Sequence, residues 1–168
     1  MINFFNSALE KLKNQNESTV EEEDQAIDSI AKLFVEAASI DGEISEEEYN
    51  HIQTILINQL KLNELKAKKI LEQVISESQN EIEIWSKTKE IRDKMDYDER
   101  LKIVGNLWEI VLIDEIVDDY EANLMRRVSG LLYISDFDSA ESKKNAIKNL
   151  QNKNWLIRKS SNNYDIYC

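Results

Sequence analysis

The feature that most limits the fold of this chain is its lack of residues that interrupt helices. The 168 residues include no proline and only three glycines. Tight hairpin turns depend on glycine and proline, and most of the residues that are abundant here, such as Glu, Lys and Leu, favour helix. We therefore predict an all-α protein. A chain of this length is most simply one domain.

Apolar residues recur every three or four positions from about residue 20 to residue 150, which is the spacing of one helical face. They form seven segments of helical length, and the fifth is the most apolar and is expected to be central. The segments are marked by Ile27 to Ala38, Ile52 to Leu60, Leu65 to Val74, Ile84 to Met95, Leu101 to Val111, Leu124 to Leu132, and Ala140 to Leu150.

The ends of the chain differ from this helical domain, which we predict over 19–150. Residues 1–18 hold a short amphipathic helix and a polar linker, and the apolar positions of that helix are Ile2, Phe5, Leu9 and Leu12. Such a helix suits a membrane surface, a partner, or a face of its own domain, and in a small protein the last is favoured. Residues 151–168 lose the periodicity and are predicted to form a tail.

The charge balance excludes some classes of partner. The chain has 33 acidic and 21 basic residues and a net charge of −12, which repels nucleic acid. Its one cysteine, Cys168, excludes an internal disulfide and fits a reducing compartment. No secretory signal is present, and no apolar run approaches the ~18 residues that a membrane span requires. We predict a cytoplasmic protein without a membrane span.

Two acidic stretches, 41–48 and 114–121, lie in matching sequence contexts. Residues 30–48 align with residues 103–121 without a gap. The alignment pairs Ile30 with Ile103, Glu36 with Glu109, Asp41 with Asp114, and Glu48 with Glu121. We infer that one unit, consisting of a helix, an acidic turn and a second helix, is used twice. Each unit alone would expose an apolar stripe, so the two are expected to pack face to face.

Helix capping explains part of this acidity. Ser45 with Glu48 fits a capping box, and Asp118 with Glu121 repeats the spacing. Capping does not explain Asp41, or Asp114 in the second stretch, because an acid at the end of a helix is unfavourable by ~0.3–1 kcal/mol. Gly42 is expected to take a positive φ and to turn the chain sharply after Asp41.

Two interpretations of the acidic turns remain. In the first, each Asp accepts hydrogen bonds from the amides of the next helix and no metal is needed. In the second, oxygen atoms from both turns bind a hard divalent cation, Ca²⁺ or Mg²⁺. The site is not an EF-hand, because Gly42 follows Asp41 directly and the alternating acidic loop is absent.

The pattern resembles the TerB-like family of tellurite-resistance and stress proteins. The resemblance covers about residues 20–150 and rests on 36-EAASIDGEISEEE-48 and 108-WEIVLIDEIVDDYE-121. The stretch 126-RRVSGLLYISDFD-138 is similar to the alphaproteobacterial-type branch. The resemblance implies about seven helices and a shared metal-binding acidic patch, whose matching residues are Asp41, Glu48, Asp114 and Glu121. Glu115 departs from the glycine of the family's second turn.

Other chemistries fit the sequence less well. Glu48 and His51 form E-x-x-H, half of a di-iron motif, but His51 is the only histidine. A Mg²⁺-dependent phosphohydrolase would use acidic pairs such as Glu43 with Glu46, yet these lie in turns without basic clusters nearby. We expect His51 to pair with Glu47 or Glu48 along its helix. Glu36 and Glu109 lie in apolar helices, and we expect them to hydrogen-bond to a helix start.

These observations predict a non-enzymatic TerB-like protein of the stress response with no catalytic residues. We expect it to bind a protein partner and a divalent cation at the acidic patch. The alternatives are the Mg²⁺-dependent phosphohydrolase and a helical partner-binding module whose turns bind no metal.

Overall fold

The computed structural model describes residues 19–40, 42–77, 84–113, 117 and 119–162, with side chains described except for 19–23 and 154–162. Every regular element within these residues is a helix, so the all-α prediction is confirmed. The predicted N-terminal helix lies outside the described residues. The described helices are α2 (Thr19–Ala38), α3 (Glu46–Leu60), α4 (Glu64–Glu77), α5 (Ile84–Lys94), α6 (Tyr97–Val111), α7 (Asp119–Leu131) and α8 (Asp136–Asn162).

Several helices begin at a short polar motif. Ser45 caps α3, and its hydroxyl accepts a hydrogen bond from the backbone N–H of Glu48. Asp96 caps α6 in the same way, and the Glu99 carboxylate accepts from the Asp96 backbone N–H. At α8 the Ser135 hydroxyl accepts from the backbone N–H of Asp138. These motifs satisfy amides that have no partner inside the helix.

Two helices are followed by a residue in the left-handed backbone conformation, which glycine adopts most easily, but neither of these residues is glycine. Lys61 follows α3 with φ of 57°, and Tyr133 follows α7 with φ of 56°. The Ile134 N–H then donates to the Ser129 carbonyl at 2.9 Å, which closes a Schellman-type end for α7. A left-handed conformation is unfavourable for both residues because each carries a Cβ atom.

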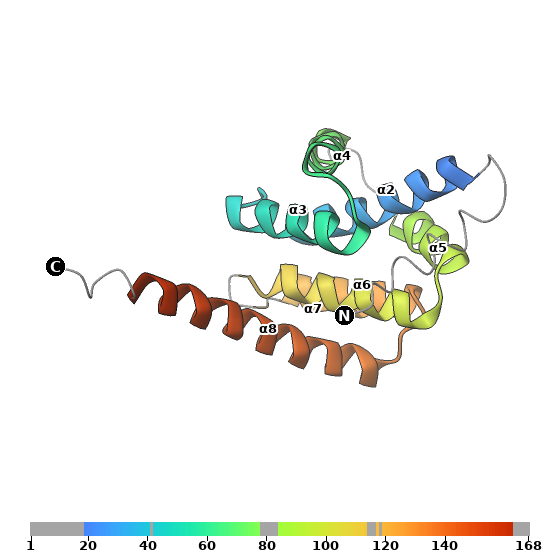
Figure 1. Cartoon of the computed structure of the whole chain (residues 1–168). Coiled ribbons are helices and arrows are strands. Elements are labelled where there is room, and N and C mark those ends of the chain that lie inside the picture. Colours follow the sequence, from blue (N-terminus) through green and yellow to red (C-terminus); the bar gives the residue numbers. More distant parts are fainter. Residues whose placement is uncertain (1–18, 41, 78–83, 114–116, 118, 163–168) are drawn as a thin grey trace.

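Helix α6 occupies the centre of the fold, as its apolar sequence predicted. It packs against α2, α3, α7 and α8, and in Figure 1 it lies between α8 and the α2–α3 pair. Most of its side chains are buried, including Trp108, which is 8% exposed. Helices α4 and α5 both pack against α2, and α5 also contacts α7.

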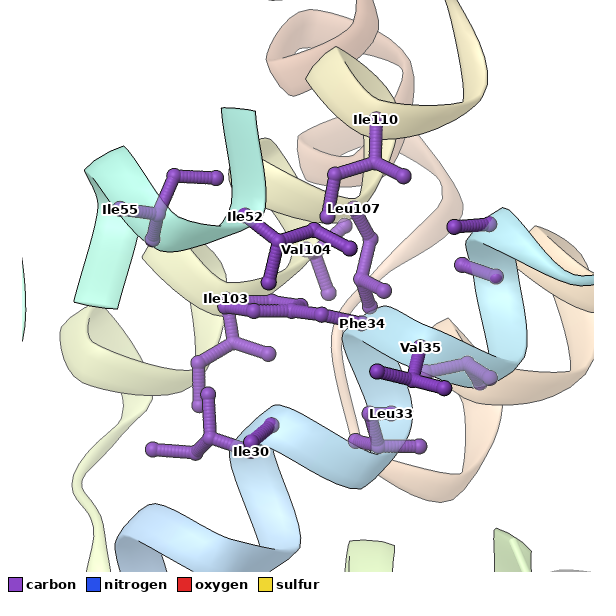
Figure 2. Packing of buried hydrophobic residues seen from close by; sticks show 14 of the residues in the cluster. Ile30, Leu33, Phe34, Val35, Ile52, Ile55, Ile103, Val104, Leu107 and Ile110 are labelled. Carbon is purple, nitrogen blue, oxygen red and sulfur yellow. The ribbon is translucent and has the colours of Figure 1, made fainter. Parts of the chain in front are cut away.

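The core is apolar where α2, α3 and α6 meet. Figure 2 shows the ring of Phe34 from α2 among side chains that include Ile52 of α3 and Ile103 of α6. All three side chains have 0% exposure. Burying apolar area of this kind is the main favourable term in folding.

Helix α8 continues to Asn162 and therefore extends into the range 151–168 that was predicted to be a tail. The sequence explains the difference, because no glycine or proline follows residue 130 to stop the helix. None of the described helices is long and apolar enough to cross a membrane.

Candidate functional site

The turn between α2 and α3 carries the first acidic stretch. Helix α2 ends at Ala38, and the Ser39 N–H continues its pattern by donating to the Val35 carbonyl at 2.9 Å. The Gly42 N–H then donates to the Ser39 carbonyl at 3.1 Å, with φ of 137° at Gly42. The predicted positive φ is confirmed. Glycine is suited to this turn because side-chain-bearing residues rarely adopt such a φ.

Glu48 forms the predicted capping box with Ser45, which is confirmed. Its Oε2 atom accepts from the Ser45 backbone N–H and from the Ser45 hydroxyl, both at 2.8 Å. Its Oε1 atom makes no hydrogen bond to any residue that the structure describes. Glu48 is half-buried. One oxygen of this carboxylate therefore holds the start of α3.

The other predicted ligands are placed only in part. Asp41 and Asp114 lie outside the described residues, as does Asp118 of the second predicted capping box. Glu121 lies in the first turn of α7 and is 7% exposed. The described residues contain no group of three His, Cys, Asp or Glu side chains suited to a metal ion. A metal site at the two turns would therefore need at least one of the acidic residues outside the described range, which are Asp41, Asp114, Glu115 and Asp118.

A cluster around Glu109 of α6 joins three helices. Glu109 Oε2 lies 3.2 Å from His51 Nε2 of α3 and 3.6 Å from Lys153 Nζ of α8. Asn149 of α8 donates from Nδ2 to Glu109 Oε1 at 2.8 Å. The side chains of His51 and Glu109 are 11% and 13% exposed. The His51–Glu109 contact has ion-pair distance, but its alignment is not that of a hydrogen bond.

This cluster corrects two predictions. His51 was expected to pair with Glu47 or Glu48 along α3, but it reaches across to Glu109 because its side chain faces the interior between α3 and α6. Glu109 was expected to contact the backbone at a helix start, and its partners are instead side chains. The only advance sign was an acidic residue inside an apolar helix, which requires a partner when it is buried.

The electrostatics of Glu109 and Glu36 differ. Burial tends to raise the pKa of Glu109, but its contacts with His51, Asn149 and Lys153 outweigh burial and lower that pKa. Glu36 of α2 is half-buried, and burial raises its pKa, with only partial opposition from the charge of Arg127 in α7. Glu109 is therefore held as a carboxylate more firmly than Glu36.

Comparisons with known proteins give one family. A family model described as tellurite resistance protein TerB matches residues 18–144. This range includes both acidic stretches and the described helices from α2 to the first part of α8. Of the cluster around Glu109, it includes Glu109 and His51 but not Asn149 and Lys153. No curated protein and no solved structure matches the chain.

Proposed function

The chain belongs to the TerB family of tellurite resistance proteins, and from this membership we propose that it is a non-enzymatic stress-response protein. It acts in the cytoplasm by binding a protein partner, and its acidic turns bind a divalent cation. The observation that carries the proposal is the range of the family match, because residues 18–144 include both acidic stretches.

The chemistry of the turns supports a hard cation. Carboxylate oxygens are the ligands that Ca²⁺ and Mg²⁺ prefer, and the proposed ligands are Asp41, Glu48, Asp114 and Glu121. The capping box engages only Oε2 of Glu48, so a cation bound through Oε1 would leave the start of α3 intact. Gly42, with its positive φ, turns the chain sharply in the segment between the proposed ligands Asp41 and Glu48.

A metal-free module is the second candidate, and the Ser45–Glu48 capping box favours it. Glu48 already has a structural role there, and the described residues alone supply no set of three ligands. In this case the acidic turns are helix caps and surface charge, and the partner binds without a cation.

Metal titration separates these two candidates. The chelator-treated protein would be titrated with Ca²⁺, Mg²⁺, Mn²⁺ and Zn²⁺ by calorimetry, and its melting temperature would be followed in parallel. At a hundredfold excess over the dissociation constant, one bound ion adds ~2.7 kcal/mol to the free energy of unfolding. We expect Asp41→Asn and Asp114→Asn each to reduce this gain.

The control for the titration is Glu46→Gln with Glu47→Gln. Both residues are exposed acids in the first turn of α3 and are not among the proposed ligands. This variant removes two negative charges nearby, one more than either aspartate variant, and should still keep the metal response. No heat, no change in melting temperature, and equal stability of all variants would support the metal-free module.

A further inference from the structure

Three exposed aromatic side chains lie around the turn between α7 and α8. Tyr97 begins α6, Tyr133 lies in the turn, and Phe137 lies in the first turn of α8. They are 37%, 66% and 76% exposed. We call these three residues the aromatic corner. Aromatic side chains with this exposure are typical of surfaces that contact another segment or protein.

Two of the three rings of the aromatic corner, those of Tyr97 and Tyr133, are held in place by contacts with other helices. The Tyr97 hydroxyl donates to Asp138 Oδ2 at 2.5 Å, which links α6 to α8. The Arg92 guanidinium lies 4.3 Å from the centre of the Tyr133 ring and donates to the Leu131 carbonyl at 2.8 Å. The two tyrosines are therefore preorganised, and a segment that binds there need not order them first.

Tyr133 has a left-handed backbone conformation, in which a tyrosine is unusual. A φ of 56° is unfavourable for tyrosine, and glycine is the usual residue at this position after a helix. Strain of this kind is often found where a side chain has a function. Arg92 packs on the Tyr133 ring, yet two thirds of the residue remains exposed.

We propose that residues 2–13 of the same chain cover the aromatic corner. The direction of α2 supports this proposal, because residues 2–13 precede that helix in the chain. Ser29 of α2 hydrogen-bonds to Glu90 of α5, and Lys94 at the end of α5 hydrogen-bonds to Gln25 of α2. The two helices therefore run antiparallel. The start of α2, which extends ~9 Å before Gln25, therefore lies beyond the Lys94 end of α5, the end from which the chain continues into α6.

The length of the preceding chain is sufficient. Residues 14–18 can span ~17 Å when extended, and a helix over residues 2–13 would be ~18 Å long. Tyr97 follows Lys94 closely in the sequence. The segment can therefore reach the corner without a change in the described helices.

The chemistry of the segment matches that of the corner. Residues 2–13 provide an apolar face for the aromatic rings, with Ile2, Phe5, Leu9 and Leu12 at helical spacing. Lys11 and Lys13 give the segment a local positive charge in a chain of net charge −12. Asp98 and Asp136, in the first turns of α6 and α8, are exposed beside the corner. Arg92 and Arg100 lie over the rings of Tyr133 and Tyr97, so the two lysines are attracted to the aspartate side of the corner and repelled from the arginine side. This difference favours one orientation of docking.

Limited trypsin digestion of the full chain tests the proposal. Cleavage after Lys11 and Lys13 would be followed by mass spectrometry, because a docked segment is protected while it is bound. We expect Phe137→Ser to speed this cleavage about tenfold, which corresponds to the loss of one aromatic contact. Phe137 is exposed in the described fold, so the substitution should leave the helices folded, as circular dichroism would verify.

Two further variants make the result specific. Tyr133→Gly removes a ring and relieves the unfavourable φ, so cleavage should be faster although the domain is at least as stable. Tyr120→Ser is the matched control, because Tyr120 is 75% exposed at the start of α7, and it should leave the cleavage rate unchanged.

Two outcomes would overturn the proposal. Equal cleavage rates in the parent, Phe137→Ser and Tyr133→Gly would show that the corner does not hold the segment. Protection that disappears on dilution would show that residues 2–13 are protected by contact with a second copy of the chain and not by their own aromatic corner.

Discussion

At the scale of single residues, the Glu109 carboxylate joins three helices that are distant in the sequence. It contacts His51 of α3 and both Asn149 and Lys153 of α8, while it is itself part of α6. Its side chain is 13% exposed, so water screens these contacts less than it screens surface pairs. The contacts of Glu109 with His51, Asn149 and Lys153 favour its ionised form, so protonation of this carboxylate would weaken them.

The first prediction concerns Glu109→Gln and its pH dependence. The pKa of Glu109 is lowered by folding, so its contribution to stability is complete above the ordinary value of 4.5 and is lost as the pH falls through the folded pKa. We expect the variant to lose about 1–2 kcal/mol of unfolding free energy at pH 7. The difference from the parent should shrink as the pH falls below 4.5 and through the lowered pKa of the folded state.

Urea unfolding at a series of pH values measures this difference. The control is Glu72→Gln. Glu72 is 58% exposed, and its Oε1 atom lies 3.8 Å from Lys68 Nζ. Such an exposed pair contributes ~0–1 kcal/mol, so the control should stay close to the parent throughout. A loss at Glu109→Gln that did not vary with pH would contradict an ionised role for this residue.

At the scale of elements, local sequence motifs determine where helices start and how they are joined. The Ser45–Glu48 and Asp96–Glu99 boxes begin α3 and α6. The α2–α3 turn depends on Gly42, whose φ of 137° is rare for any residue with a side chain. The turn therefore fixes how α3 leaves α2, and with it the position of the first acidic stretch.

The second prediction is that Gly42→Ala destabilises the protein. A Cβ atom at Gly42 would meet no heavy atom within 4 Å, so the effect would come from the backbone conformation and not from crowding. We expect a loss of about 1–3 kcal/mol in unfolding free energy, measured by thermal and urea denaturation.

Gly105→Ala is the matched control for this prediction. Gly105 lies inside α6, and a Cβ atom there also meets nothing within 4 Å. Alanine favours helix over glycine by about 0.5–1 kcal/mol, so this variant should be more stable than the parent. Opposite signs for the two substitutions are expected, and a loss of stability in both would indicate a general intolerance of added volume.

At the scale of the whole molecule, one apolar core joins the helices. It includes buried residues from α2 through α8, with α6 in the centre. Phe34 is among the largest fully buried side chains, and it packs where α2, α3 and α6 meet (Figure 2). Because the helices share this core, we expect them to unfold together.

The third prediction is that Phe34→Ala lowers the unfolding free energy by about 3–5 kcal/mol, because it leaves a cavity in this core. The measurement is urea unfolding followed by tryptophan fluorescence and by circular dichroism, whose midpoints should coincide. Leu65→Ala is the control, since Leu65 is 65% exposed, and its effect should stay within about 0.5 kcal/mol. Separate midpoints would mean that parts of the fold unfold independently.

The sequence by itself determined the helical class, the central place of α6, the capping box at Ser45 and the positive φ at Gly42. These features depend on residues within about one helical turn of each other, or on the apolar spacing along one element. The TerB family is likewise visible in short stretches around the two turns, and the family match confirms it. The joint metal site of Asp41, Glu48, Asp114 and Glu121 stays a prediction.

Only the tertiary structure decided which side chains meet across helices. Local spacing offered Glu47 and Glu48 as partners for His51, but packing brings it to Glu109 of α6. The aromatic corner likewise combines residues from α6, the α7–α8 turn and α8. Such pairs depend on the rotation and crossing of packed helices, which are set by the fit of many side chains together. No single stretch of the sequence contains that information.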